Sequence, residues 1–394
     1  MTERKILIAG AGLGGLAAAG CLLKAGYDVE IYEQAPVLGE VGAGIQMSAN
    51  AMHVLNHLGV GDEISAKSVR PEAYVFRLHD TGELIDRFAL SEEHMKMHKA
   101  PYNQAHRADL HEILANAVQK MKPGVVHLNK RATHFEETAE SVELFFDDGT
   151  NAKGDVLVGA DGVKSVIRNQ IAGAVPAVYT GDSAWRITVP KDKLPSDFME
   201  KVMSVWMGPG KHAVSYWLRN GELLNFVGAV ETPTASEESW TAKFPWEDLK
   251  ADFVGWHEDI QTVIDLADHD QCFRWALYKR PVVDTWSTAR ATILGDAAHA
   301  TLPYLAQGAA MAIEDGAVLA RALGQEDDTA EALTLYHRNR VERTSRVVET
   351  SDANRNLFHL DSVEEIRKSF ASRNEGADRN GWLYSYNPLT VELV

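Results

Sequence analysis

The sequence predicts a mixed α/β (α+β) fold, in which a helix-flanked parallel sheet is interleaved with an antiparallel sheet and followed by C-terminal helices. Three observations predict this fold. A short apolar strand enters a glycine-rich turn and a helix near the N-terminus, in "KILIAGAGLGG". Short alternating segments with glycine turns run from Tyr179 to Glu231, as antiparallel strands do. A long charged helical pattern covers Thr329 to Leu357.

The length and composition narrow the class of protein. With 394 residues, 45% of them hydrophobic, the chain is long enough for two interlocked domains and a sizeable core. The net charge of −17 argues against nucleic acid and against an anionic membrane as partners. Cys21 and Cys272 are the two cysteines, so we expect buried thiols, no disulfide framework and a cytoplasmic protein.

One N-terminal segment imitates a membrane element. Ile6 to Leu23 is an uncharged run of 18 residues that follows Arg4 and Lys5, which satisfies the length of a membrane span and the charge pattern of a signal peptide. Five glycines interrupt this run, and four of them crowd one turn. We therefore interpret the segment as strand, turn and helix.

The glycine turn has the spacing of a dinucleotide-binding fingerprint. Gly10, Gly12 and Gly15 form G-x-G-x-x-G between the strand and the helix, and Glu33 ends the next strand 18 residues later. The glycines let the backbone approach a pyrophosphate at the helix N-terminus, and the acid can accept hydrogen bonds from ribose hydroxyls. The sequence therefore predicts a Rossmann-type dinucleotide site, which could hold NAD or FAD.

Three further motifs follow in the N-terminal part. A second glycine-rich approach to a helix runs from Gly39 to Gly59, where Ser48 or Asn50 could cap the helix. Arg107 stands just before another predicted helix. A predicted three-stranded meander and an apolar strand then lead into "GADGVKSVIR", Gly159 to Arg168. Its residues form either a plain turn with a solvated arginine or part of a ligand site.

The antiparallel segments carry a candidate pair for moving protons. In "KHAVSYWLRNGELLNFV", Asn220 and Gly221 predict a hairpin turn. His212 and Tyr216 lie four positions apart on the preceding strand, so they share one face. On a sheet that faces a ligand, this pair could move a proton. The alternative is a rim histidine and a core tyrosine, which spacing alone favours.

The stretch "ILGDAAHATLPYLAQGAAMAIEDG", Ile293 to Gly316, has an unusual composition for a loop. An acid, Asp296, follows a buried strand, the next residues carry almost no charge, and small residues open a helix at Gln307 and Gly308. A surface loop is normally polar. We therefore expect a ligand to lie against this one.

The last long helix is predicted to be a surface helix across the back of the molecule. Its arginines, Arg338, Arg340, Arg343 and Arg346, are spread around it, so it is not expected to bind an anion. The sequence has no repeat, no His/Cys cluster with metal-ligand spacing and no nucleophile elbow. We therefore expect no metal site.

Three of these motifs, in this order, resemble the single-component flavoprotein aromatic hydroxylases that use FAD and NAD(P)H. They are "GAGLGG", "GADGVKSVIR" and "LGDAAHATLPYLAQGAAMAIED", and the resemblance spans nearly the whole chain. "HRADLHEIL", "GEVGAGIQMSAN", "LRNGELLN" and "GWLYSYNP" are similar to salicylate and 3-hydroxybenzoate hydroxylases. The resemblance implies an FAD-binding domain at 1–178 and 276–325, a substrate-binding sheet domain at 179–275 and a C-terminal helical segment at 326–394.

The resemblance also implies which residues hold FAD. Asp296 would hold the ribityl chain or the pyrophosphate, and Arg107 the phosphates. The helix that begins at Gln307 would stabilise negative charge near the flavin O2 position. Gln46 would lie beside the isoalloxazine or the substrate, and the backbone of Ala132 beside the adenine. The full set of implied contacts is Gly10, Gly12, Leu13, Gly15, Glu33, Gln34, Gln46, Arg107, Ala132, Asp161, Asp296, Gln307, Gly308 and Ala309.

The mechanism that the resemblance implies begins with oxygen activation. Reduced flavin and O2 form a C4a-hydroperoxide, which attacks an electron-rich ring, so a phenol must lose its proton. His212 would be the base or proton relay, and Tyr216 would orient the substrate. Gln46 would assist beside the ring, and Pro303 would help to keep water from the reactive face. Because the chain has a single G-x-G-x-x-G, NADH or NADPH would bind only transiently.

Several functional alternatives stay open. The implied substrate is a small aromatic acid of the salicylate or 3-hydroxybenzoate type, and the main alternative is a hydroxypyridine carboxylate such as 6-hydroxynicotinate. Halogenation is disfavoured because "AWRITVP" has Ile187 where halogenases carry a second tryptophan. A non-oxygenase flavoprotein and an NAD-dependent dehydrogenase are lesser alternatives. A homodimer is implied by the resemblance alone.

Overall fold

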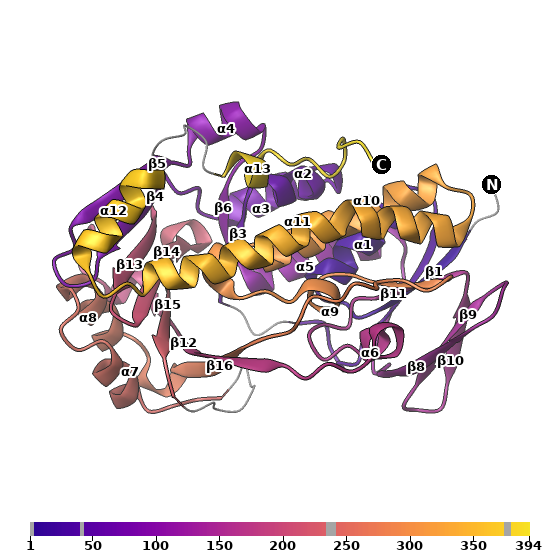
Figure 1. Cartoon of the computed structure of the whole chain (residues 1–394), viewed down its shortest axis with the longest axis horizontal. Coiled ribbons are helices and arrows are strands. Elements are labelled where there is room, and N and C mark those ends of the chain that lie inside the picture. The colour runs from indigo at the N-terminus through magenta and orange to yellow at the C-terminus, as the bar shows by residue number, and fades with distance from the viewer. Residues whose placement is uncertain (1–3, 40–42, 234–241, 374–379) are drawn as a thin grey trace.

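Two large sheets organise the computed structural model of the chain, which describes residues 4–39, 43–233, 242–373 and 380–394 (Figure 1). A five-stranded sheet has the strand order β17-β11-β1-β2-β7, and a seven-stranded sheet has the order β16-β12-β15-β14-β13-β4-β5. The predicted α/β (α+β) architecture is confirmed. Within the predicted glycine-rich approach from Gly39 to Gly59, residues 40–42 lie outside the described ranges.

The five-stranded sheet is parallel throughout, and most of its residues are buried. Parallel strands that are covered on both faces appear in a sequence as continuous apolar runs. This explains why the strand at the start of the segment from Ile6 to Leu23 is uncharged. The glycine turn joins the first strand to α1 (Leu13–Lys24), which packs against α5 (Arg107–Met121) and α10 (Gly308–Gln325). The strands are β1 (Lys5–Ala9), β2 (Asp28–Tyr32), β7 (Val126–His127), β11 (Val156–Gly159) and β17 (Ala291–Ile293).

Glycines let α1 and α10 approach each other closely. A Cβ atom on Gly14 would lie 2.9 Å from Cβ of Ala312, and one on Gly316 would lie 2.6 Å from Cα of Ala18. Real Cβ atoms do not approach other atoms so closely, so larger residues at these positions would push the helices apart. Small residues next to the fingerprint glycines and on α10 therefore allow the close packing of these two helices.

The seven-stranded sheet contains the predicted antiparallel segments, and β4 pairs in parallel with β13. The predicted hairpin turn lies where expected, and Asn220 and Gly221 have φ values of 58° and 93°, a region that Asn and Gly tolerate. The strands are β4 (Ala73–Leu78), β5 (Leu84–Ala89), β12 (Val178–Pro190), β13 (Met203–Gly208), β14 (Lys211–Leu218), β15 (Leu223–Glu231) and β16 (Phe273–Lys279).

The two faces of this sheet belong to two different cores. Alternate residues such as Val205 and Tyr216 join the core of the five-stranded sheet. Their neighbours, such as Trp206 and Trp217, join a second core with α7 (Trp246–Asp252) and α8 (Glu258–Asp265). One face of the sheet therefore turns toward the glycine-turn half of the molecule, and His212, Val214 and Tyr216 share that face by alternation.

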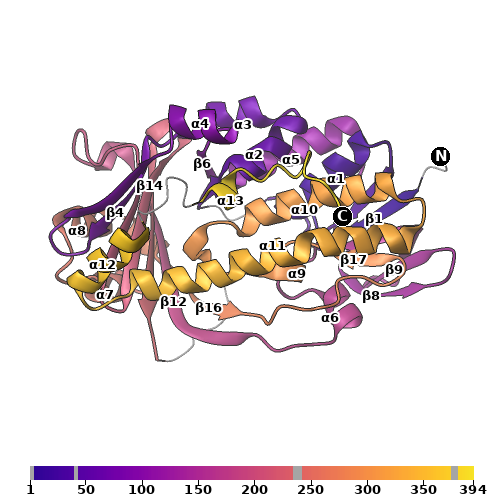
Figure 2. The same cartoon turned by 45° about the horizontal axis from the view of Figure 1, so that its top comes forward.

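The long helix α11 (Thr329–Phe358) spans the molecule from the five-stranded to the seven-stranded sheet (Figure 2). The helix lies on the surface along one side, as predicted, and Arg338 and Arg346 are exposed there, but not all of its arginines face water. Arg340 is fully buried, and its guanidinium lies 2.7 Å from carboxylate oxygens of both Glu314 and Asp315 on α10. An arginine in a charged stretch of sequence is normally expected to face water. Arg340 instead forms ion pairs with two buried acids on the neighbouring helix α10.

Shorter elements complete the described fold. A two-stranded sheet pairs β3 (Gly44–Met47) with β6 (Asn103–His106), and the predicted meander comprises β8 (Ala132–Glu137), β9 (Val142–Phe146) and β10 (Asn151–Gly154). The short helices are α2 (Ala49–His57), α3 (Gly61–Lys67), α4 (Glu92–His98), α6 (Val166–Ala172), α9 (Asp296–His299), α12 (Val363–Arg373) and α13 (Gly381–Tyr384), with one-turn segments η1 (Lys191–Lys193), η2 (Arg219–Gly221), η3 (His269–Gln271) and η4 (Pro303–Leu305). Both cysteines are buried and free. Within the described ranges, no helix is long and apolar enough to cross a membrane.

Candidate cofactor and substrate site

The glycine turn leaves the start of α1 open to a ligand. A Cβ atom on Gly15 would lie 2.1 Å from the carbonyl oxygen of Gly10, whereas one on Gly12 would meet no described atom within 4 Å. Gly12 is the N-cap of α1 and provides no side-chain cap. Glu33 accepts hydrogen bonds from the N–H groups of Ala11 (2.8 Å) and Ala35 (2.9 Å). The carboxylate is thus fixed beside the turn, where a ribose could reach it.

Arg107 and Ala132 lie on segments that are tied to this turn. His111 of α5 contacts the carbonyl oxygen of Ala11 at 2.8 Å, and Arg107 lies one helical turn earlier on the same face of α5. The chain that enters β8 at Ala132 passes the same acid, because the N–H of Lys130 donates to the carbonyl of Glu33 (2.8 Å). Of the other implied contacts, Leu13 is buried in the first turn of α1 and Gln34 is exposed.

Asp161, predicted to contact the cofactor, has a structural role in the turn after β11. Its Oδ2 accepts hydrogen bonds from the N–H groups of Val166 (2.8 Å) and Ile167 (3.3 Å) at the start of α6. Its Oδ1 is buried and has no partner among the described residues, and burial raises the pKa of the carboxyl group. One oxygen therefore fixes the turn, and the other is left for a donor from outside.

The stretch after β17 brings an acid next to a bare helix start. Gly295 has a φ of 60°, a conformation that favours glycine, and turns the chain so that Asp296 is exposed. A Cβ on Gly308 would lie 4.0 Å from Oδ1 of Asp296. Among the described residues, no side chain caps α10, and its first turn has no acid. The N–H groups of Gly308 and Ala309 can therefore bind an electronegative group.

Gln307 contributes its backbone to this site, because its side chain is used elsewhere. The amide is buried, donates to Oγ of Ser48 (3.0 Å) and accepts from Nδ2 of Asn50 (3.0 Å). Ser48 is the N-cap of α2 but makes no capping hydrogen bond. The predicted capping role of Ser48 or Asn50 is therefore wrong, and both residues instead fix the start of α10.

These groups fit FAD. Two uncapped helix starts, at Gly12 and Gln307, offer N–H groups to a pyrophosphate and to the flavin ring. Glu33 and Asp296 would offer carboxylates to the ribose and ribityl hydroxyls, and Arg107 would offer a cation to the phosphates. The missing Cβ at Gly12 leaves the space that such a ligand needs.

Gln46 and Tyr216 are brought together although 170 residues separate them. Gln46 is buried on β3, accepts a hydrogen bond from the hydroxyl of Tyr102 and donates to Sδ of Met203 (3.2 Å). On the same strand, a Cβ on Gly44 would lie 2.4 Å from the hydroxyl oxygen of Tyr216. Burial raises the pKa of Tyr216, which stays protonated at neutral pH and can donate a hydrogen bond.

Arg186 on β12 joins this group, and the sequence reasoning missed it. Its guanidinium stacks on Trp275, 4.5 Å from the ring centroid. Burial lowers its pKa to about 10, with Tyr216 and Arg107 as the neighbouring groups that act on it, so it is a cation at pH 7. Arg186 and Val214 both lie opposite Val227, which places them in one row across the sheet. An arginine inside the apolar run "AWRITVP" was the available signal.

His212 lies deep on the same face and has two aromatic neighbours. It is 3% exposed, and its ring centroid is 5.2 Å from those of Tyr304 and Phe358. Its Nδ1 lies 2.8 Å from Nε2 of His359. Burial holds the pKa of His212 well below its usual range, so the ring is neutral and can accept a proton. Its Nε2 has no hydrogen-bond partner among the described residues.

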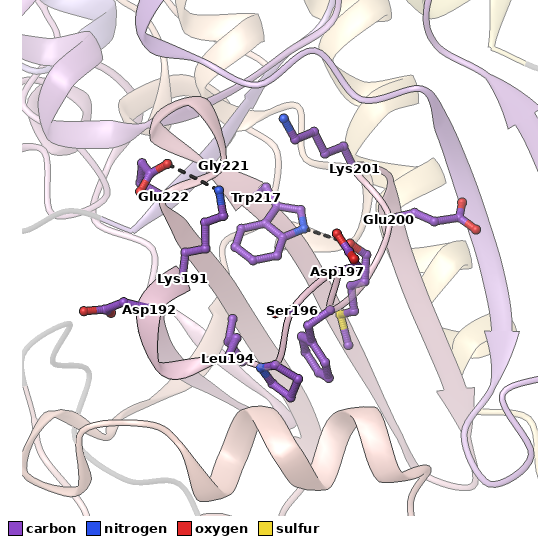
Figure 3. A pocket seen from close by; sticks show the side chains of 13 residues that line it. Lys191, Asp192, Leu194, Ser196, Asp197, Glu200, Lys201, Trp217, Gly221 and Glu222 are labelled. Carbon is purple, nitrogen blue, oxygen red and sulfur yellow. Dashed lines mark hydrogen bonds and ion pairs between the residues drawn. The ribbon is translucent and has the colours of Figure 1, made fainter.

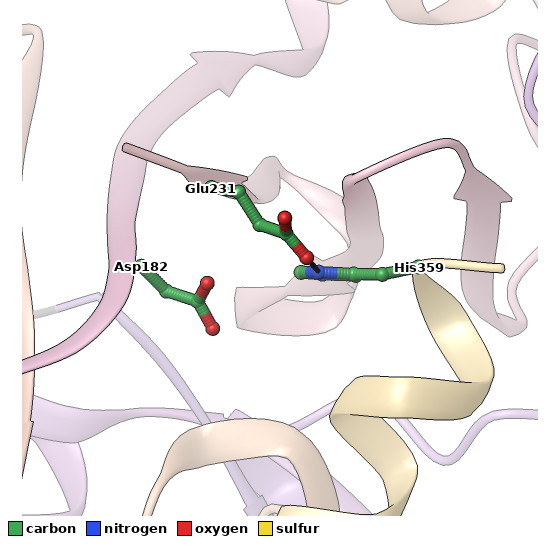
Figure 4. A group of neighbouring side chains, drawn as sticks. All are labelled: Asp182, Glu231 and His359. Carbon is green, nitrogen blue, oxygen red and sulfur yellow. Dashed lines mark hydrogen bonds and ion pairs between the residues drawn. The ribbon is translucent and has the colours of Figure 1, made fainter. Parts of the chain in front are cut away.

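A cluster of charged groups lies behind His212. Nδ1 of His359 is 3.0 Å from Oε1 of Glu231, and Asp182 stands beside them (Figure 4). These three residues have the ligand types of a metal site. The guanidinium of Arg355, however, binds both oxygens of Asp182 (2.5 and 2.6 Å) and contacts Glu231 at 3.3 Å. The positive charge beside these two acids is therefore supplied by the guanidinium of Arg355.

Pro303 lies on an exposed turn whose neighbours are anchored in the protein. The hydroxyl of Tyr304 donates to Asp182 (2.5 Å), and the carbonyl of Leu302 accepts from Oγ of Ser351 on α11 (2.8 Å). Leu302 and Tyr304 are buried, whereas Pro303 is exposed. The apolar loop is therefore partly core, and Pro303 is the part that a ligand could cover.

A separate hollow of about 760 Å³ opens near the other core of the seven-stranded sheet (Figure 3). Its lining includes Trp217, Lys191 and Lys201. Trp217 follows Tyr216 in β14 and points to the opposite face, so this hollow is not part of the site that contains Tyr216. It contains none of the predicted site residues.

Comparisons with known proteins agree with this geometry. The family model described as "FAD binding domain" matches residues 3–351. A 3-hydroxybenzoate 6-hydroxylase of Polaromonas naphthalenivorans is 37% identical over 97% of this chain and 96% of its own. A 6-hydroxynicotinate 3-monooxygenase of Bordetella bronchiseptica is 35% identical over 99% and 97%. The structure of Klebsiella pneumoniae HpxO with FAD and uric acid superposes with a TM-score of 0.84, at 26% identity over 98% and 97% of the two chains.

Proposed function

The chain belongs to the family of FAD-dependent aromatic hydroxylases, and from this premise we propose that it hydroxylates a small phenolic acid of the 3-hydroxybenzoate or salicylate type. The reductant would be NADH or NADPH, which reduces the flavin and leaves. FAD, when bound, supplies the activation of O2. The remaining steps depend on residues of this chain.

The observation that carries the proposal is the neutral, buried His212 on the same sheet face as Tyr216 and Arg186. Ring attack by an electrophilic oxygen is faster on a phenolate than on a phenol, so the substrate must lose a proton. Nε2 of His212 would accept it, because burial keeps this ring neutral at pH 7. The protonated hydroxyl of Tyr216 and the amide of Gln46 would hold the substrate in place.

Arg186 supports an acid as the substrate. A half-buried guanidinium near Arg107 favours a negatively charged ligand. Arg107 is assigned to the FAD phosphates, and Arg186 lies on the substrate sheet near Tyr216. We therefore assign Arg186 to the carboxylate of the substrate, for which a guanidinium can form two parallel hydrogen bonds.

Water exclusion would come from both sides of the site. The turn that contains Pro303 is anchored through Leu302 and Tyr304 and presents its exposed proline. A ligand that covers this proline would bury its own ring in the same step. A dry site prevents loss of the activated oxygen to water.

The test is oxidation of NADH and of NADPH by the FAD-loaded protein in the presence of salicylate, 3-hydroxybenzoate, 4-hydroxybenzoate and 6-hydroxynicotinate. We expect one acid to stimulate oxidation, and mass spectrometry to find a product that has gained one oxygen atom, with the carboxylate either retained or released as CO2. His212→Gln should abolish the product while the flavin is still reduced. Protein that binds no FAD, or product formation that survives in His212→Gln, would overturn the proposal.

Arg186→Met tests the carboxylate assignment. We expect KM for the acid to rise about 10- to 100-fold, the effect of losing a charged hydrogen-bonded pair. KM for phenol, which has no carboxylate, should rise only slightly. Arg274→Met is the matched control, because Arg274 also stacks on a tryptophan, Trp185, at 5.1 Å and Trp185 belongs to the other core.

A second candidate substrate is 6-hydroxynicotinate. The relative that is 35% identical over 99% of this chain carries that activity in its name. The same base, tyrosine and arginine would suit a hydroxypyridine carboxylate, whose ring also becomes electron-rich on losing a proton. The panel above separates the two by the mass of the product.

A further inference from the structure

We propose that His359 and Glu231 form a relay that carries the phenolic proton of the substrate from His212 to solvent. This inference rests on the proposed function, because it begins with His212 as the base. It adds two residues that lie beyond the substrate, on α11's C-terminal cap and on the end of β15. Both are positioning and proton-transfer residues that do not touch the substrate.

The distances describe a continuous hydrogen-bonded chain. Nδ1 of His212 lies 2.8 Å from Nε2 of His359, and Nδ1 of His359 lies 3.0 Å from Oε1 of Glu231. With the proton on Nδ1 of each ring, both rings donate toward Glu231, and Nε2 of His212 is the acceptor that remains. That nitrogen has no partner among the described residues. The chain therefore has an open acceptor at one end and a carboxylate at the other.

Burial changes along this chain in the way that a proton path needs. His212 is 3% exposed and His359 7%, whereas the side chain of Glu231 is 47% exposed. A proton accepted by His212 has no direct contact with bulk water. Glu231 has that contact and can release the proton to water or buffer.

Charged residues surround the outer end of this chain, whereas burial keeps the two rings neutral. Arg355 contacts Glu231 at 3.3 Å, and Asp182, which Arg355 also binds, lies close to His359. The hydroxyl of Tyr304 donates to Asp182. Burial lowers the pKa of both His212 and His359, although Glu231 and Asp182 act on His359 in the opposite sense. Arg355 keeps Asp182 as a partner when Glu231 takes a proton.

The transfer balances without any further reactant. The phenol O–H bond breaks and a bond forms at Nε2 of His212. The proton on its Nδ1 moves to Nε2 of His359, and the proton on Nδ1 of His359 moves to Glu231. The products are a phenolate, two neutral rings with the opposite tautomers, and a protonated carboxyl group that exchanges with water. The reverse transfer, as the hydroxylated product takes back a proton, restores both tautomers.

The first test compares three single variants of the FAD-loaded protein. His359→Gln and Glu231→Gln retain polar side chains but cannot pass the proton on. With 3-hydroxybenzoate as the probe acid, or 6-hydroxynicotinate if that is the acid hydroxylated, we expect kcat for product to fall at least about tenfold with KM nearly unchanged. Reduction of the flavin by NADH without acid should be unaffected. Imidazole in the buffer should restore part of the rate to His359→Ala, which a purely structural role would not allow.

Glu222→Gln is the matched control, because Glu222 is also an exposed glutamate, precedes β15 at the end opposite to Glu231, lies 3.6 Å from Lys191 and is outside the chain of histidines. It should match the unmodified protein in kcat and in pH profile. Equal kcat and equal pH profiles in Glu231→Gln, His359→Gln and the unmodified protein would overturn the relay.

A second measurement does not depend on catalysis. Histidine ring signals in the NMR spectrum of the FAD-loaded protein, assigned through His212→Gln, report the titration of His212 directly. If the chain is connected, Glu231→Gln shifts the titration of His359, and His359→Gln shifts that of His212. If no acid is hydroxylated, the proposed function fails while this coupling still supports the connected chain. Titration of His212 that is unchanged in His359→Gln overturns the relay whatever the substrate.

Discussion

Two charge clusters contact the same helix, α11, and differ in their access to water. The inner cluster comprises Glu314, Asp315, Arg340 and Arg343, and the side chains of its first three members are 0% exposed. The outer cluster comprises Asp182, Glu231, Arg355 and His359, and one of its acids, Glu231, is 47% exposed. A sealed cluster holds its protons fixed, whereas an open one can exchange them. The inner cluster is thus suited to structure and the outer one to chemistry.

The inner cluster also places the cofactor site. Glu314 accepts from Arg340 (2.7 Å), from Arg343 (2.8 Å at each of its oxygens) and from Nδ2 of Asn50, which in turn donates to Gln307 at the start of α10. Oδ2 of Asp315 accepts from the N–H of Gly295 (2.9 Å). The buried charges therefore fix both sides of the loop that carries Asp296.

The largest expected effect follows from breaking the inner cluster. Arg340→Met leaves two buried carboxylates without their shared cation, so we expect the free energy of unfolding to fall by about 3–5 kcal/mol. Urea denaturation of the FAD-loaded protein measures it. Arg338→Met, an exposed neighbour on α11, is the control. A loss below about 1 kcal/mol for Arg340→Met would mean that the cluster is not structural.

The pH dependence of stability gives the next effect. Despite burial, His299 and Arg340 lower the pKa of Asp315 from 3.8 to about 2. Because the folded pKa is the lower one, Asp315 stabilises the fold above about pH 4, and this contribution, about 2 kcal/mol, is lost as pH falls toward 2. Urea denaturation between pH 5 and pH 2 should show a steeper loss for the unmodified protein than for Asp315→Asn. Parallel curves would contradict the assignment.

Breaking the outer cluster should cost less stability. Arg355→Gln removes two hydrogen bonds to Asp182, but Tyr304 still donates to this acid, and the guanidinium is partly solvated. We expect a loss of about 1–2 kcal/mol in unfolding free energy. The pH profile of hydroxylation should shift at the same time, since the charge of Arg355 is one of the causes that, after burial, lower the pKa of His212 and His359. A change in stability with an unaltered pH profile would mean that Arg355 has only a structural role, like the residues of the inner cluster.

The smallest effect is expected at an ion pair that belongs to neither cluster. Lys191 and Glu222 are 3.6 Å apart with exposed side chains. Glu222→Gln should change the free energy of unfolding by less than about 0.5 kcal/mol. Thermal unfolding at low and at high salt measures it, and a shift as large as that of Arg355→Gln would remove the distinction between solvated and buried pairs.

Local motifs made much of the fold predictable from the sequence. Gly10, Gly12 and Gly15 identify the strand, turn and helix because each glycine acts within a few residues of chain. The uncharged loop before Gln307 was recognisable for the same reason. Alternation alone placed His212 and Tyr216 on one face of β14. These features need no knowledge of distant contacts.

Distant contacts account for what the sequence did not reveal. His359 meets His212 across 147 residues, and Arg355 meets Asp182 across 173. No local pattern marks such partners. Arg340 was misread because an arginine among charged residues normally faces water, and only the packing of α11 on α10 buries it. The roles of the site residues stay predictions until the variants above are measured.

The strand order of the five-stranded sheet determines when, during translation, this sheet can be completed. Its outer strand β17 pairs with β11, for example at Ala291 and Leu157. The last strand of the seven-stranded sheet, β16, ends earlier in the sequence, at Lys279. The ribosome must therefore make the whole seven-stranded sheet before the five-stranded sheet can be completed. Until then the nascent chain carries an open strand edge along β11, which invites pairing with other chains. The bare start of α10 emerges later still. A newly made chain therefore cannot form its complete flavin cradle until most of the polypeptide has been translated.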